Sequence, residues 1–82
     1  MTVRQLSNEV DEIQCEAIIQ QYDYEKNDYA FRVHMSELYS GLDEHERVMD
    51  RRVKYIFADM EETNRVFNTK QPVLIIEVED EE

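Results

Sequence analysis

The sequence predicts a small α+β fold in which a mainly antiparallel sheet, made of a hairpin and a C-terminal strand, packs on one long helix. Apolar residues alternate near Ala17 and Phe31, recur at helical spacing over 43–67, and form a β-branched run near the C-terminus. The 82 residues include one Gly and one Pro, which favours one domain with few loops. We assign residues 1–78 to a single acidic domain of order ββαβ, and residues 79–82 to a frayed acidic tail.

The first predicted strand begins at Ile13, from which Cys15, Ala17 and Ile19 alternate with polar residues. A period of two is typical of a half-buried strand. Ile18 interrupts the alternation, so a helix over residues 7–22 is the alternative. Its apolar residues would not share one helical face, and we therefore favour the strand. A short helix over residues 7–12 remains open ahead of it.

The second predicted strand contains Tyr29, Phe31, Val33 and Met35, which alternate with smaller or polar residues. The polar residues 25–28 lie between the two strands and are rich in turn formers. The two strands are therefore expected to form an antiparallel hairpin.

The longest predicted element is a helix from Asp43 to about Phe67. Acidic and basic residues four apart, such as Asp43 and Arg47 or Asp50 and Lys54, have the orientation that supports a helix. Met60 is expected at the centre of the buried face, where an Asp substitution would unfold the domain. The core-facing stripe is expected to contain Leu42, Met49, Val53, Ile56, Met60, Thr63 and Phe67.

The residues after this helix predict a last strand. Pro72 cannot continue a helix, and the run Val73–Val78 is rich in β-branched residues. We expect this run to join the sheet of the hairpin.

The residue inventory does not suggest catalysis. A single Gly cannot form a glycine-rich phosphate loop, and one Cys with two separated His residues does not match the spacing of a zinc site. Cys15 lies between Gln14 and Glu16, without the positive neighbours that activate a thiol. We therefore predict a protein that is not an enzyme and that needs no metal or cofactor.

The sequence favours a cytoplasmic location. A single cysteine cannot form an internal disulfide, which suits a reducing compartment. The first residues do not resemble a signal peptide, and the longest apolar run, Val73–Ile76, is too short to cross a membrane.

The strongest signal is the net charge of −11, from 20 acidic and nine basic residues. Such a chain is repelled by phosphate backbones and anionic membranes, and is attracted to basic protein surfaces. The predicted helix is nearly neutral, so the acidity lies on the hairpin and near the C-terminus. The candidate partner-binding residues are Glu12, Glu16, Asp23, Glu25, Asp28, Glu77, Glu79, Asp80, Glu81 and Glu82.

Three of these acids have the spacing of a strand face. If the last strand continues, Glu77, Glu79 and Glu81 would present carboxylates about 6.6 Å apart on one side. This repeat is close to the phosphate repeat of a nucleic-acid strand. The same charges would also serve as protection against edge-to-edge aggregation.

These observations favour a binding protein over a catalyst. In size, charge and absence of a catalytic constellation, the chain resembles, in kind and without a shared motif, the small acidic inhibitors that phages encode against host nucleic-acid-binding defence enzymes. This resemblance implies a DNA-mimic inhibitor in the host cytoplasm that occupies a basic nucleic-acid-binding surface. The alternative is an assembly module, a homodimer or a small subunit of a complex, whose apolar helix face contains Val48, Tyr55 and Val66. In that case the acidity would serve solubility alone.

Overall fold

A computed structural model describes residues 1–10, 15–64 and 69–80 of the chain. Over these residues, short helices accompany a mixed sheet of four strands. The elements in chain order are α1 (Val3–Glu9), β1 (Glu16–Asp23), β2 (Asp28–His34), the 3-10 helix η1 (Met35–Ser40), α2 (Asp43–Met49), β3 (Val53–Asn64) and β4 (Thr69–Val78).

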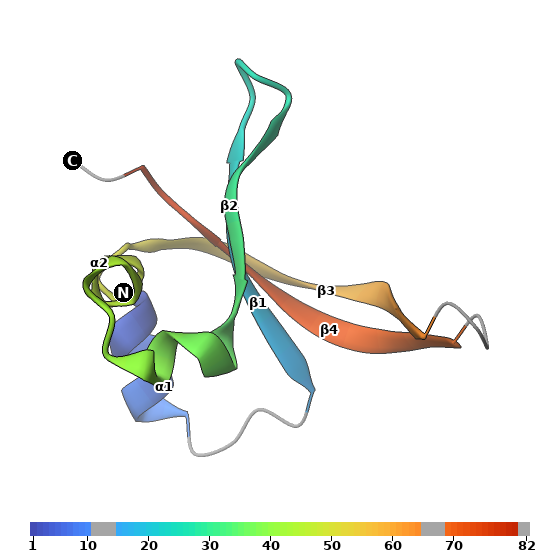
Figure 1. The fold of residues 1–82 in the computed structure, drawn as a ribbon, viewed down its shortest axis with the longest axis horizontal. Helices are drawn as coiled ribbons and strands as arrows, with labels where there is room; N and C mark the ends of the chain where they lie inside the picture. Colours follow the sequence, from blue (N-terminus) through green and yellow to red (C-terminus); the bar gives the residue numbers. More distant parts are fainter. Residues whose placement is uncertain (11–14, 65–68, 81–82) are drawn as a thin grey trace.

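The sheet consists of two hairpins joined through their central strands. Its order is β2-β1-β4-β3, with β1 antiparallel to β2, β3 antiparallel to β4, and β1 parallel to β4 (Figure 1). The parallel pairing runs from Glu16 opposite Val73 to Gln20 opposite Glu77. Parallel neighbours require a crossover connection, and η1, α2 and β3 provide it.

The main core lies between the helices and one face of the sheet. Ile19 and Ile76, which pair between β1 and β4, are fully buried there. The helices add further side chains to this core, among them Val3 from α1, Leu38 from η1 and Met49 from α2. Apolar burial of this kind is the principal stabilising contribution in a domain of this size.

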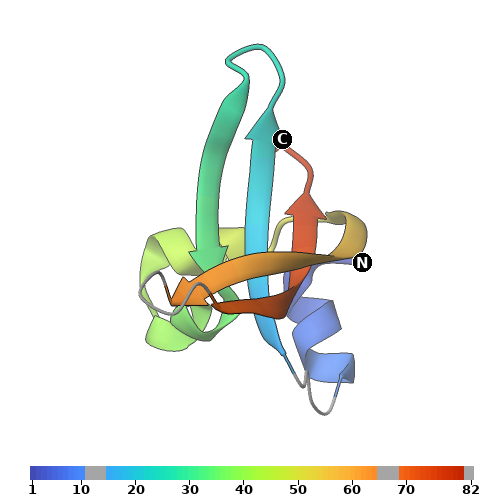
Figure 2. The ribbon, with the colours of Figure 1, turned by 90° about the vertical axis from the view of Figure 1, so that its right-hand side faces the viewer.

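The opposite face of the sheet is also covered, because the sheet curls. Arg32 on β2 and Glu61 on β3 form an ion pair, although these outer strands are three strand spacings apart, about 14 Å in a flat sheet. Figure 2 shows the β3–β4 hairpin crossing in front of β1 and β2, with the helices behind. This curl explains a second buried cluster on that face, formed by Ile18, Val73 and Ile75.

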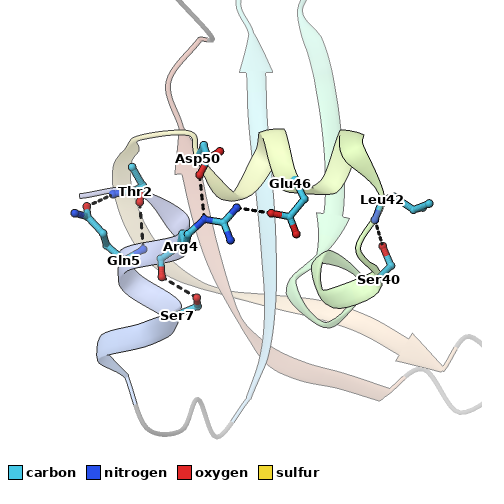
Figure 3. Close-up of polar contacts among 8 residues, drawn as sticks. All are labelled: Thr2, Arg4, Gln5, Ser7, Ser40, Leu42, Glu46 and Asp50. Carbon is cyan, nitrogen blue, oxygen red and sulfur yellow. Dashed lines mark hydrogen bonds and ion pairs between the residues drawn. The ribbon is translucent and has the colours of Figure 1, made fainter.

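The N-terminal helix α1 is held by a capping box at its start and by ion pairs to the region of α2. Thr2 and Gln5 form a reciprocal capping box, with Thr2 Oγ1 accepting from Gln5 N at 3.1 Å and Gln5 Oε1 accepting from Thr2 N at 2.8 Å. Arg4 then bridges to α2 through Glu46 at 2.5 Å and Asp50 at 3.0 Å (Figure 3). The capping box therefore stabilises the start of α1, and the two ion pairs dock this helix against α2.

The predicted helix over 43–67 is wrong. Within its described part, residues 43–64, only Asp43–Met49 is helical, and the chain then forms β3, the longest strand of the sheet. The segment contains Tyr55, Ile56 and Phe57, which are β-formers, and pairing with β4 runs along β3 and satisfies the backbone groups on one of its two sides. Ion pairs at i,i+4 stabilise a helix by only about 0.2–0.5 kcal/mol each, too little to compete with this pairing.

The predicted core-facing stripe fails with the helix. Met49 is buried and Val53 packs against the main core, but Leu42, Ile56 and Met60 are 52%, 42% and 54% exposed. Met60→Asp is therefore expected to be tolerated, contrary to the sequence expectation. Phe67 and the side chain of Thr63 lie outside the described residues.

The order ββαβ and the mainly antiparallel sheet are corrected as well. The hairpin is confirmed, with Asn27 in its turn at φ 52°, but the sheet has a fourth strand and a parallel centre. Pro72, expected to precede the last strand, lies inside β4, at a position beyond the β1 pairing where a missing N–H breaks no bond to β1. A short N-terminal helix exists, but it spans Val3–Glu9 and not residues 7–12.

Within the described part of the chain, no helix has the length and apolar character needed to cross a bilayer.

Ile76 and Ile56 offer a matched test of this fold, because they face each other across the β3–β4 pairing while Ile76 is fully buried and Ile56 is 42% exposed. Ile76→Ala is expected to lower the free energy of unfolding by about 2–5 kcal/mol. Ile56→Ala should lower it by about 1 kcal/mol or less. Urea unfolding measures both, and equal losses would contradict the described burial.

Candidate functional site

A cleft opens where β1 and β4 stop pairing. The last parallel pair is Gln20 with Glu77, and beyond it β1 continues into the hairpin while β4 turns away (Figure 1). The cleft has a volume of about 510 Å³. Its walls are formed by Gln21, Tyr22, Asp23, Tyr24 and Glu25 on one side and by Glu77, Val78, Glu79 and Asp80 on the other, with Lys54 from β3.

Glu77 lies at the point where the two strands separate. One of its carboxylate oxygens, Oε1, accepts a hydrogen bond from the backbone N–H of Tyr22 at 2.9 Å. This side chain thus satisfies a backbone donor of β1 that no longer has a β4 partner. Glu77 is only 2% exposed, and its second oxygen, Oε2, is buried with no hydrogen-bond partner among the described residues.

Side-chain hydrogen bonds connect the two walls near the open end of the cleft. Gln21 donates its amide N–H to Asp80, and Arg51 donates to Gln21 Oε1 at 2.9 Å. Arg51 also donates to the backbone oxygen of Glu79 at 3.0 Å. These bonds hold the residues after β4 beside the hairpin.

The cleft is acidic. Among its described lining residues, five carry a carboxylate and one, Lys54, carries a positive charge. The two walls come from distant parts of the sequence. Because β1 and β4 are parallel, the carboxyl ends of these two strands lie at the same edge of the sheet, and the two walls meet there. A cationic group is therefore the chemical class that this cleft attracts.

Tyrosine rings cover the same end of the sheet. The rings of Tyr22 and Tyr24 meet edge to face with centroids 4.9 Å apart, and Tyr29 lies 5.2 Å from Tyr22. Tyr55 is the cross-strand partner of Glu77. A hydrogen bond with Tyr24 raises the pKa of the Tyr55 phenol, and partial burial and the negative charge of Glu77 add to the increase.

The structure gathers half of the acidic residues selected from the sequence. Asp23, Glu25, Glu77, Glu79 and Asp80 all line the cleft. Glu16 lies at the other end of β1, where its Oε1 is 2.7 Å from His34 Nδ1. Asp28 is exposed on β2 opposite Asp23 but does not line the cleft, and Glu12, Glu81 and Glu82 lie outside the described residues.

The carboxylates of the cleft do not form the expected row along a strand. Glu77 is buried, β4 ends at Val78, and Glu79 follows the strand. One carboxylate oxygen of Asp23 is also engaged within the hairpin turn, because Oδ1 accepts hydrogen bonds from the backbone N–H groups of Glu25 and Lys26 at 3.0 and 3.3 Å. The acids surround a hollow instead of imitating a linear phosphate array.

The structure does not show the apolar helix face that the sequence predicted as an alternative interface. Val48 is partly buried against the main core, and Val66 lies outside the described residues. Tyr55 is 43% exposed, but it belongs to β3 and to the tyrosine group beside the cleft.

Sequence reasoning missed the cleft itself and the contributions of Tyr22, Tyr24, Gln21 and Lys54. The dense tyrosines at 22, 24 and 29 were visible, but their convergence with Glu77 depends on the parallel pairing. Over the described residues, no three His, Cys, Asp or Glu side chains gather closely enough to hold a metal ion. Comparisons with family models, curated proteins and solved structures give no match to this chain.

The contact between Tyr24 and Tyr55 can be tested by titration. Tyr24→Phe should bring the pKa of Tyr55 down toward the ordinary value of about 10, because the bond that favours the protonated phenol is lost. The measurement is the pH dependence of the Tyr55 ring carbon signal in NMR. Tyr39→Phe, an exposed residue of η1, is the control and should leave that pKa unchanged. An equal Tyr55 pKa in wild type and Tyr24→Phe would contradict the geometry.

Proposed function

We propose that this protein is a non-catalytic binding protein that inhibits or regulates another protein by occupying its basic nucleic-acid-binding surface. The observation that carries the proposal is the cleft, in which the acids of the hairpin and those of the C-terminal segment come together. Two acidic segments separated by most of the sequence meet at one hollow.

The electrostatics support a basic protein partner. The net charge of −11 would repel nucleic acid, while five carboxylates in one cleft provide a focused negative potential. Opposite charges steer encounter and make the association rate sensitive to salt. A partner held here would have its own phosphate-binding residues covered, which accounts for inhibition without chemistry.

A cytoplasmic location belongs to the same proposal. Cys15 is a free thiol of intermediate burial, and a reducing compartment would keep it so.

The outer edge of β3 supports a second candidate function, self-association into a homodimer. Ile56, Phe57 and Met60 are 42%, 39% and 54% exposed on a long edge strand. Unpaired apolar edges are templates for pairing with another chain. Light scattering on wild type and Phe57→Lys tests this: a dimer that the substitution converts to a monomer supports it, and a monomeric wild type excludes it.

The proposed function predicts that the position of the negative charge matters more than its amount. A variant with Asp23→Asn, Glu25→Gln, Glu79→Gln and Asp80→Asn should bind a short peptide rich in arginine and lysine about tenfold more weakly than wild type at low salt. The loss should shrink as salt is raised, because exposed charges are screened within about 8 Å at physiological ionic strength. Fluorescence anisotropy of the labelled peptide measures both effects.

The matched control removes four acids that are exposed and lie outside the cleft: Glu9→Gln, Glu37→Gln, Asp43→Asn and Glu44→Gln. It has the same net charge as the cleft variant, and it should keep most of the wild-type affinity. Equal weakening in the two variants would show that only the overall charge acts. The proposed cleft function would then be rejected.

A further inference from the structure

The buried carboxylate of Glu77 is costly to the free protein. Its Oε2 atom has neither solvent contact nor a hydrogen-bond partner among the described residues, although the side chain lines an open cleft. Leaving a buried polar group without a hydrogen-bond partner destabilises a protein, and the effect is larger when the group is charged. A cleft that carries such an oxygen in its wall has an unfilled acceptor, which indicates a ligand that donates hydrogen bonds.

The surroundings of Glu77 specify the shape of that donor. The backbone N–H of Tyr22 donates a hydrogen bond to Glu77, and Tyr55 lies directly opposite Glu77 on the neighbouring strand β3. Tyr24 contacts both tyrosines, by its ring against Tyr22 and by its hydroxyl against Tyr55. The acceptor therefore lies among aromatic rings, and a planar cation can stack on aromatic faces while it donates to a carboxylate.

A cation of the protein already lies beside this site. The ammonium nitrogen of Lys54 is 6.0 Å from the ring centroid of Tyr55, and Lys54 is an exposed residue of the cleft wall. Lysine provides a compact, strongly hydrated charge and lacks the planar guanidinium that stacks on aromatic rings. Lys54 thus shows that the cleft accepts positive charge, and its exposed side chain can be displaced.

We infer that the cleft is a receptor site for one arginine side chain of the basic partner, with the guanidinium group donating to Glu77 and stacking on the neighbouring tyrosine rings. Entry requires Tyr24, which is 72% exposed, to leave its contacts with Tyr22 and Tyr55 and change rotamer. The inference rests on the proposed function, which requires only a basic partner, and it adds that recognition is selective for arginine.

The test compares three peptides of otherwise identical sequence, in which one central residue is arginine, lysine or citrulline. Citrulline has nearly the shape of arginine without its charge. Wild type should bind the arginine peptide about tenfold or more tightly than the lysine peptide, and the citrulline peptide weakest of all. Equal affinities for arginine and lysine would overturn the inference.

Two variants separate a binding role of Glu77 from a structural one. Glu77→Gln keeps an acceptor for Tyr22 N and removes the charge, so the arginine preference should disappear while the unfolding midpoint stays equal or rises. Lys54→Gln should strengthen arginine binding, because the competing cation is lost. Glu37→Gln is the charge control and should change neither. Retained arginine preference in Glu77→Gln, or weaker arginine binding in Lys54→Gln, would contradict the site.

The outcomes distinguish the two proposals. Equal binding of arginine and lysine peptides that is lost in the four-acid cleft variant would leave the basic-partner function and reject the arginine site. Failure of wild type to bind either cationic peptide at low salt would reject both.

Discussion

β1 and β4 lie side by side in parallel at the centre of the sheet, and both the main core and the cleft depend on this pairing. It joins two hairpins into one sheet and buries Ile19 and Ile76 under the helices. It also sets both carboxyl ends at one edge, so that the hairpin and the C-terminal segment face each other. Where the pairing ends at Gln20 and Glu77, the strands separate and the acidic cleft begins.

Local patterns predicted one of the two hairpins. The alternation at Tyr29, Phe31 and Val33 and the polar turn before it correctly predicted the hairpin. Ile18, which broke the alternation, is explained by a strand buried on both faces, with Ala17 and Ile19 in one cluster and Ile18 in the other. Residues 53–64 were predicted wrongly because apolar spacings of three and four, which are typical of a helix, are also compatible with an exposed strand.

The composition of the site was more predictable than its geometry. Charge counting selected Asp23, Glu25, Glu79 and Asp80, because the segments that contain them carry more acidic than basic residues. It could not show that Glu77 turns inward to bond Tyr22, since that contact replaces a lost strand partner. The burial of one carboxylate and the exposure of its neighbours follow from where the parallel pairing stops.

The measurement that tests this account most directly is an NMR titration of the labelled protein with the arginine peptide, followed at the backbone amides. The account predicts saturable shifts at Gln21–Glu25 and Glu77–Asp80, with the largest at Tyr22, whose amide is bonded to Glu77. The amides of Glu9, Glu37 and Asp43 should not move. Small, unsaturated shifts spread over all exposed acids, or shifts confined to the β3 edge, would contradict it.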